Sequence, residues 1–220
     1  MIIPYFFLSF NTVFKFEHIL NKVIHLWRKK MLLELQYDRV RAVDYAKKWA
    51  LERNPLFIDF TGSGGDCTNF VSQCIFAGCG VMNYTPTFGW YYVSPEDRAP
   101  AWSGVDELFN FLTGAEDFIS QNGGSGPYGR NASVAQTVEL GDVIQLRNGN
   151  GDYYHTLIIS GFTDTDILVC AHSDDALNRP LSTYNYASLR VIHIDGARLF
   201  FDSEAIFNAI YNGESLPKPT

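Results

Sequence analysis

The clearest hydrophobic pattern in this 220-residue chain starts at Cys67. Apolar side chains recur there at helical intervals of three and four residues, namely at Cys67, Phe70, Val71, Cys74 and Ile75. This spacing predicts an α-helix with one buried face, which Gly78 or Gly80 can end. The helix follows a glycine-rich turn directly, so its first residue is a cysteine.

The same periodicity predicts three further helices. The first spans 34–53, before an Asn-Pro pair. Its apolar stripe comprises Val40, Val43, Ala46 and Ala50, with Tyr45 and Trp49 beside it. The second begins at a capping-box-like pair, Ser103 and Asp106, and stops at Gly114. The third is a short helix at 203–211.

The second half of the chain changes to patterns typical of β-strands. Strands are predicted at 142–147, 154–161, 167–172 and 189–195, with turns at 148–151 and 163–166 between them. The glycine-rich stretch 121–131 is predicted to be a flexible loop. Because helices come first and strands later, we expect an α+β fold whose helices pack on a mainly antiparallel sheet.

We expect one domain at 31–200, with an extension before it and a short tail after it at 201–220. Residues 1–30 begin with an apolar run that is too short to span a bilayer and lacks the marks of a signal peptide. Their second part, 14–30, is amphipathic and fits either a helix on a membrane surface or, as we favour, a helix packed on the domain. A further interpretation is an extension upstream of a true start at Met31. Localisation is unknown, and the lack of a clear signal peptide favours the cytoplasm.

The amino-acid composition says more about which partners are disfavoured than about the fold. The chain has 17 lysines and arginines against 24 aspartates and glutamates, a net charge of −7. We therefore expect no general basic surface for nucleic acid. Its four cysteines form neither a Cys-x-x-Cys pair nor a small disulfide scaffold, so we expect no metal and no cofactor. Cys74, Cys79 and Cys170 are expected to be small buried apolar residues.

The residues around Cys67 suit a catalytic nucleophile. The glycine-rich run 62–65 lets a substrate approach the backbone closely, because glycine has no Cβ. A thiol in the first turn of a helix lies near unpaired N–H groups and the positive end of the helix dipole, which stabilise a thiolate and an oxyanion. We expect Asp66 to cap this helix by accepting an N–H from Thr68 or Asn69.

A cysteine nucleophile needs a general base, and His155 is the best-placed histidine. It opens a strand directly after a glycine turn. If this strand forms a hairpin with 167–172, His172 ends the partner strand at the same sheet edge and can orient the His155 imidazole. Asp174 and Asp175 are alternatives for that role. The remaining histidines, His18, His25 and His193, are expected to be structural or surface residues.

A loop rich in tyrosine and tryptophan follows the cysteine helix. Aromatic residues in loops line grooves for sugar or peptide in some proteins and pack the loop onto the core in others. From this loop and the start of the helix we select five candidate substrate-binding residues, namely Asp66, Asn69, Trp90, Tyr91 and Trp102.

With these residues in hand, the chain closely resembles the bacterial putative amidase domain family over roughly residues 35–195. The likeness is strongest in the run Gly-Gly-Asp-Cys-Thr-Asn-Phe-Val-Ser-Gln-Cys at 64–74. That family is similar to the NlpC/P60 and CHAP-like branch of papain-like cysteine amidases and peptidases. The resemblance implies a papain-like fold and cleavage of an amide bond through a thioester, with Cys67 as nucleophile and His155 as base. It also implies His172 as the third polar residue, although CHAP-like relatives hold Glu or Asn there.

We therefore expect a papain-like cysteine amidase or peptidase acting on a peptide or amide, with a peptidoglycan stem peptide as one candidate because related enzymes often act on cell-wall peptides. Two other functions fit the same residues. One is a non-catalytic module that binds peptidoglycan or peptide through the aromatic loop. The other is an acyltransferase that uses the same Cys67–His155 pair. The reactivity of the Cys67 thiol separates the non-catalytic module from the two enzymes, because a buried structural thiol resists alkylation.

Overall fold

The computed structural model describes residues 30–115, 123–133 and 138–215. The amphipathic segment expected at 14–30 therefore lies outside the described residues, apart from Lys30. The chain divides into two units, one at 32–200 and the other made of 1–31 and 201–219. The helices are α2 (Arg39–Trp49), α3 (Cys67–Cys79), α4 (Pro100–Ser103), α5 (Val105–Thr113) and α7 (Ser203–Asn212), with a short 3-10 helix η1 (Leu181–Thr183).

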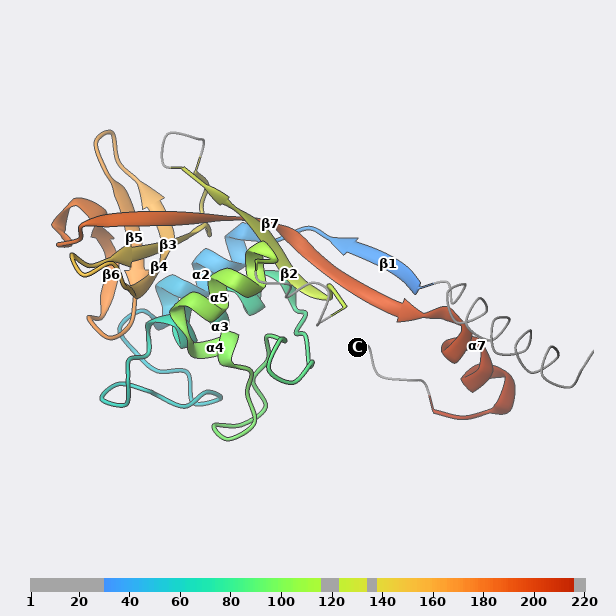
Figure 1. Cartoon of the computed structure of the whole chain (residues 1–220). Coiled ribbons are helices and arrows are strands. Elements are labelled where there is room, and N and C mark those ends of the chain that lie inside the picture. Colours follow the sequence, from blue (N-terminus) through green and yellow to red (C-terminus); the bar gives the residue numbers. More distant parts are fainter. Residues whose placement is uncertain (1–29, 116–122, 134–137, 216–220) are drawn as a thin grey trace, which may run out of the picture. The chain divides into compact units, whose positions relative to one another are not determined.

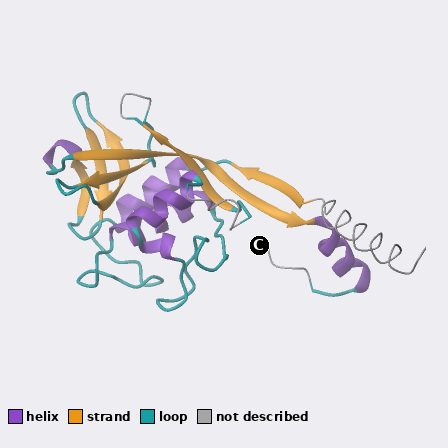
Figure 2. Cartoon of the chain, viewed as in Figure 1, coloured by secondary structure: helices purple, strands orange, loops and turns teal. Residues whose placement is uncertain are grey.

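In the part of the chain that the structure describes, the strands form one seven-stranded sheet in the order β1-β7-β3-β4-β5-β6, and β2 pairs with β7. They are β1 (Lys30–Leu35), β2 (Gly126–Ala132), β3 (Val143–Arg147), β4 (Tyr153–Phe162), β5 (Ile167–Ala171), β6 (Ala176–Pro180) and β7 (Ser188–Asp202). The pairs β2–β7, β7–β3, β3–β4, β4–β5 and β5–β6 are antiparallel. The expected combination of helices with an antiparallel sheet is confirmed (Figures 1 and 2).

Within the 32–200 unit, α2 to α5 lie together on one side of strands β3 to β5 (Figure 1). The core between them combines small residues of α2, the apolar face of α3 and every second residue of the sheet strands. Its members include Ala42, Ala46, Phe70, Val71, Cys74, Ile75, Val143, Ile158 and Cys170. Alternating residues of the same strands form a second apolar cluster on the other face of the sheet, which includes Ile144, Leu157 and Val169. Both faces are therefore buried, which explains why these strands read as nearly continuous apolar runs.

The cysteine helix forms as expected, whereas the helix expected at 34–53 is shorter. All five apolar positions of the predicted α3 face are buried, and Gly80 ends the helix in the left-handed conformation at φ 67°. The helix α2 begins only at Arg39, where Asp38 accepts the N–H of Arg41 at 3.0 Å. Val40, which was predicted to lie on the apolar stripe, has 66% of its surface exposed, whereas Val43, Ala46 and Ala50 are buried.

Other corrections concern short or glycine-rich segments. Part of the stretch predicted as a loop at 121–131 is the strand β2, in which Gly129 lies so close to β7 that a Cβ would be 2.2 Å from the His193 carbonyl oxygen. The strands β1 and β6 were also not predicted. Ser103 does not cap α5, because it belongs to α4 and its hydroxyl accepts a hydrogen bond from Arg98.

His193, which was expected to be a structural or surface residue, belongs to a polar cluster with Asp142 and Arg39. Its Nδ1 lies 2.9 Å from a carboxylate oxygen of the buried Asp142, and its Nε2 lies 3.3 Å from the guanidinium of Arg39. Arg39 donates to the same Asp142 carboxylate at 2.7 Å and to the Ile194 carbonyl at 2.7 Å. This buried polar cluster ties the start of α2 to strand β7, so His193 is structural.

The helix α7 confirms the expected helix near the end of the chain. Ala209 is buried, whereas Phe207, Ile210 and Tyr211 are exposed. No helix in the described part of the chain is long and apolar enough to cross a membrane.

Candidate active site

A cavity of about 460 Å³ lies at the start of α3 and brings the two main catalytic candidates together. Cys67 reaches it from the first residue of α3 and His155 from the beginning of β4. Both residues are mostly buried, with 6% and 7% of their surface exposed. The remaining lining residues are Gly64, Gly65, Tyr154, Ser173, Asp174, Arg179, Thr183, Tyr184 and Asn185.

The turn before Cys67 depends on its glycines. Gly64 and Gly65 have φ values of 101° and 108°, which residues with a side chain rarely adopt. Both glycines line the cavity, so the backbone itself forms the wall beside the sulfur. Because Cys67 opens the helix, the first-turn N–H groups, including its own, have no partner within the helix. Such groups can stabilise an oxyanion formed next to the sulfur.

The His155 ring is buried in a way that favours its neutral form. Burial lowers its pKa from 6.5 to about 4, while the negative charge of Asp174 opposes this shift and the positive charge of Arg179 adds to it. The ring is therefore neutral near pH 7. Its Nε2 atom is buried and has no hydrogen-bond partner among the residues that the structure describes.

Asp174 is the carboxylate of this cavity. It accepts a hydrogen bond from Arg179 at 2.5 Å, and the Arg179 guanidinium stacks over the ring of Tyr184. The Asp174 side chain is 65% exposed, so it faces solvent at the mouth of the cavity. Its charge favours a protonated His155, which is the effect expected of the third member of a cysteine–histidine site.

His172 has a different environment from the one expected. Its Nδ1 lies 2.6 Å from Asp66 Oδ2, its Nε2 lies 2.8 Å from the Trp49 carbonyl oxygen, and its ring stacks on Phe70 at 3.9 Å. Both nitrogens are thus engaged, so His172 is not placed to orient His155. His155 lies near the start of β4 and His172 directly follows the last residue of its partner strand β5, so the two histidines lie near the same sheet edge.

Asp66 and Asn69 are also structural in this arrangement. The Asp66 carboxylate makes no capping bond to α3 but accepts hydrogen bonds from the Phe60 N–H at 3.0 Å and the Asn69 amide at 2.7 Å. Asn69 in turn accepts from the Trp102 indole at 2.8 Å. Both polar residues are buried and neither lines the cavity, so their contact with substrate stays a prediction that this structure gives no support.

The aromatic loop packs onto the core. Trp90 and Trp102 are fully buried with their ring centroids 4.9 Å apart, and the Trp90 indole donates to Ser72 at 3.0 Å. Tyr91 is partly exposed but bonds to Asp97 in its own loop. None of the five residues expected to bind substrate lines the cavity that contains Cys67.

Sequence reasoning did not identify most of the residues that form the cavity wall. Arg179, Thr183, Tyr184 and Asn185 lie in β6, η1 and the segment after them, where no periodic pattern predicts an element. Tyr154 and Ser173 flank the two histidines in sequence, and that adjacency was the one available signal.

Comparison with known proteins identifies the family of this chain. The family described as "Putative amidase domain" matches residues 36–194, well over half of the chain. The chain belongs to this family. It is also 31% identical over 126 residues to the uncharacterized protein YhbB of Bacillus subtilis (strain 168). That match covers 56% of this chain and 37% of YhbB, so the chain spans little more than a third of this relative's length. No solved structure matches the chain.

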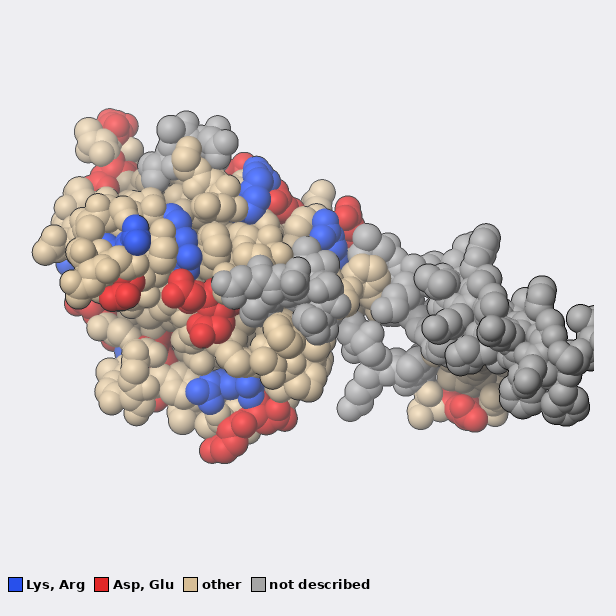
Figure 3. All heavy atoms as spheres, viewed as in Figure 1, with Lys and Arg blue, Asp and Glu red and all other residues tan. Residues whose placement is uncertain are grey.

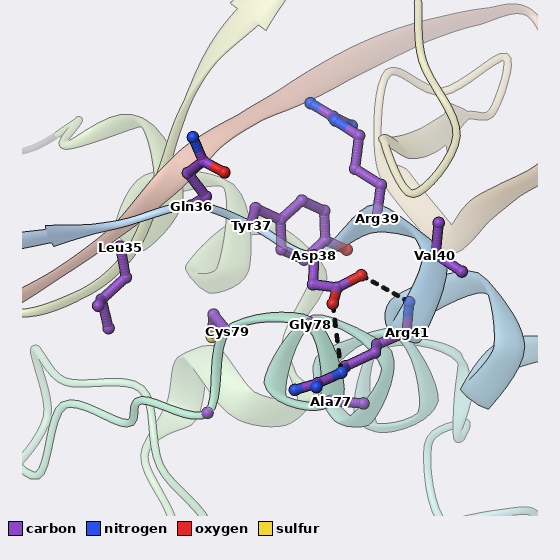
Figure 4. Close-up of a pocket in the computed structure, with 11 residues that line it drawn as sticks. Leu35, Gln36, Tyr37, Asp38, Arg39, Val40, Arg41, Ala77, Gly78 and Cys79 are labelled. Carbon is purple, nitrogen blue, oxygen red and sulfur yellow. Dashed lines mark hydrogen bonds and ion pairs between the residues drawn. The ribbon is translucent and has the colours of Figure 1, made fainter.

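A second cavity of about 600 Å³ in this amidase-family chain lies at the other end of α3, between 77–80 and 35–41 (Figure 4). Of its charged groups, Asp38 and Arg41 pair with each other at 3.2 Å, and Arg39 pairs with Asp142 at 2.7 Å. Its thiol, Cys79, has its pKa raised to about 12 by burial. A thiol in this state is a poor nucleophile at neutral pH, so this cavity lacks the chemistry of the first.

The remaining cysteines are buried, and among the described residues no acidic or thiol cluster is suited to a metal ion. Cys74 and Cys170 are fully buried, and burial raises the pKa of Cys74 well above its ordinary value. No group of three or more His, Cys, Asp or Glu side chains is arranged to hold a metal ion in the described ranges. On the face shown in Figure 3, basic and acidic residues are interspersed among uncharged ones.

Proposed function

We propose that this member of the amidase family is a cysteine-dependent amidase or peptidase whose nucleophile is Cys67 and whose general base is His155. The observation that carries the proposal is their shared cavity: a cysteine at the first residue of a helix faces the same space as a neutral histidine. Membership of the amidase family supports hydrolysis of an amide bond.

The reaction follows from the groups present. His155 accepts the proton of the Cys67 thiol, and the sulfur attacks the carbonyl carbon of the substrate amide. The resulting oxyanion lies against N–H groups at the start of α3. His155 then gives its proton to the departing amine, leaving a thioester on Cys67. Water, deprotonated by His155, attacks the thioester and releases the acid, and the proton returns to the sulfur.

Asp174 fills the third role in this proposal. Once His155 is protonated, a nearby carboxylate stabilises the imidazolium. Asp174 is the cavity residue whose negative charge raises the pKa of His155. Arg179 holds that carboxylate through an ion pair and so fixes its position beside the cavity.

We further propose that the fold is of the papain-like, NlpC/P60 and CHAP-like type, in which a cysteine helix packs on an antiparallel sheet that carries the histidine. A peptide amide is the substrate class that fits this chemistry, and a peptidoglycan stem peptide is one candidate. A module that binds ligand through the aromatic loop loses its support, because Trp90 and Trp102 are fully buried.

Turnover by variants tests the proposal. A panel of peptide amides and purified peptidoglycan fragments is incubated with the parent protein, Cys67→Ala and His155→Ala. Both variants are expected to lose about a thousandfold or more of the rate, since nucleophile and base act as one unit. Cys79→Ala is the matched control and keeps parent activity. Product analysis with added amine or alcohol separates hydrolysis from acyl transfer. Full activity in both site variants would contradict the assignment.

A further inference from the structure

A chain of buried polar side chains connects Cys67 to the interior of the 32–200 unit. The Cys67 sulfur lies 3.8 Å from the hydroxyl of Thr68, which lies 2.8 Å from the hydroxyl of Thr156. The Thr156 hydroxyl is 3.3 Å from the amide nitrogen of Gln145. Thr68, Thr156 and Gln145 are almost completely buried, so their hydrogen bonds are not shared with bulk water.

Gln145 has only one possible orientation. Its Nε2 lies 2.7 Å from the Val105 carbonyl oxygen, which can only accept a hydrogen bond. Its Oε1 lies 2.7 Å from Nε of Arg190, which can only donate. Arg190 is itself held by Asp106 at 2.6 Å and by the rings of Phe109 and Tyr153. The amide nitrogen of Gln145 therefore points toward Thr156.

The orientation of Gln145 determines the direction in which the hydrogen bonds between Gln145 and Cys67 are donated. Gln145 donates its second amide hydrogen to the Thr156 oxygen, so the Thr156 hydrogen is free to point to Thr68. The Thr68 hydrogen then points to the Cys67 sulfur. Among the contacts described here, only this direction gives both hydroxyl hydrogens an acceptor. In the opposite direction the Thr156 hydroxyl hydrogen would point to the Gln145 amide nitrogen, which is itself a donor and cannot accept it.

We infer that Thr68 is a further catalytic residue, which donates a hydrogen bond to the Cys67 sulfur and favours the thiolate, and that Thr156 and Gln145 are positioning residues that orient this donor. The inference rests on the proposed role of Cys67. A donor aimed at sulfur stabilises the anion more than the neutral thiol, because hydrogen bonds to charged groups are stronger. The same contact limits rotation of the Cys67 side chain.

The test is the pH dependence of Cys67 alkylation, which requires no substrate. Parent protein, Thr68→Val and Thr68→Ser are treated with iodoacetamide between pH 5 and pH 10, and labelling of the Cys67 peptide is followed by mass spectrometry. Thr68→Val removes the hydroxyl at nearly constant volume and is expected to move the midpoint of the profile upward by about one pH unit. Thr68→Ser keeps the hydroxyl and is expected to stay near the parent profile.

The same alkylation profile is measured for Thr156→Val and Gln145→Met. These two variants test the inference on their own if Thr68→Val does not fold. Both leave the sulfur contact in place but remove the groups that orient it, so smaller upward shifts are expected. Coincident profiles for the parent and every folded variant would overturn the inference. An unreactive Cys67 in the parent would instead contradict the proposed function, so the two failures are distinguishable.

Discussion

At the scale of single residues, the chemistry of the site depends on how deeply His155 is buried. Its pKa is about 4 in the folded chain and 6.5 when unperturbed. Between these two pH values the imidazole is neutral in the folded chain and charged in the unfolded chain. A neutral ring can accept the proton of Cys67, and the exposed carboxylate of Asp174 is available to stabilise the product. The same burial also makes the stability of the fold depend on pH.

His155 should make the protein less stable in mild acid. The pKa is lower in the folded state than the ordinary 6.5, so the unfolded state binds the proton first as the pH falls. Stability from this group is complete above about pH 6.5 and is lost progressively toward pH 4. The free energy of unfolding of the parent and of His155→Gln is measured by urea titration at pH 7 and at pH 4.5. Both values should fall as the pH is lowered, and the decrease should be about 2 kcal/mol smaller in His155→Gln. Parallel pH curves for the two proteins would show that the ring is not buried in this way.

Residue-level prediction from the sequence succeeded where the signal was local. The helix period and the glycine turn place Cys67 at a helix start, and the glycine turn before a strand places His155 at a strand end. The surroundings of Asp66 and His172 depend on contacts between residues 106 positions apart. No local pattern encodes such a contact, so their structural role was not predicted.

At the scale of elements, the start of α3 is held by a buried pair rather than by a capping side chain. The Asp66–His172 contact joins the turn before α3 to the end of β5, and the second His172 nitrogen reaches the last residue of α2. Three elements therefore meet behind Cys67. This pair supports the position of Cys67, the proposed nucleophile, and neither of its residues lines the cavity.

Variants of His172 and Asp174 distinguish support of the fold from support of the reaction. His172→Phe preserves a ring against Phe70 but removes the buried hydrogen-bond partner of Asp66 Oδ2, whose remaining ion-pair contact is Arg53 at 3.8 Å. We expect it to lower the free energy of unfolding by about 1 to 3 kcal/mol, measured by urea titration. Asp174→Asn breaks an exposed ion pair, so its stability should change by less than about 1 kcal/mol, while amide turnover falls by about tenfold or more. If His172→Phe kept parent stability and lost only turnover, His172 would be the third catalytic member after all.

Helices and strands with a clear pattern of apolar residues were predictable, whereas strands that form mainly through pairing with a distant strand were not. The predicted strands correspond to β3, β4, β5 and the first half of β7, because their apolar runs are buried on both faces. By contrast, β2 contains two glycines and a proline and exists through its pairing with β7. The helix α2 begins at Arg39 and not at residue 34, because residues 34 and 35 belong to β1. Helical periodicity alone does not reveal this boundary.

At the scale of the whole molecule, the amidase-family region at 36–194 coincides with the helices and strands that form the cavity. Its class, helices on an antiparallel sheet, was predictable because the helical and strand patterns are segregated along the chain. The cavity wall was not, since it is built by β6, η1 and the segment after them. The positions of Cys67 and His155, the proposed nucleophile and base, were therefore predictable from the sequence, whereas the shape of the cavity was not.

The most direct test of the central claim is detection of an acyl group on Cys67 during turnover. The parent protein is mixed with the best peptide amide from the substrate panel, quenched in acid within milliseconds to seconds, digested and examined by mass spectrometry. The account predicts that the peptide containing Cys67 carries the mass of the substrate acyl group and that this adduct is missing from Cys67→Ala. Turnover at a normal rate with the acyl group on another residue, or with no dependence on Cys67, would contradict it.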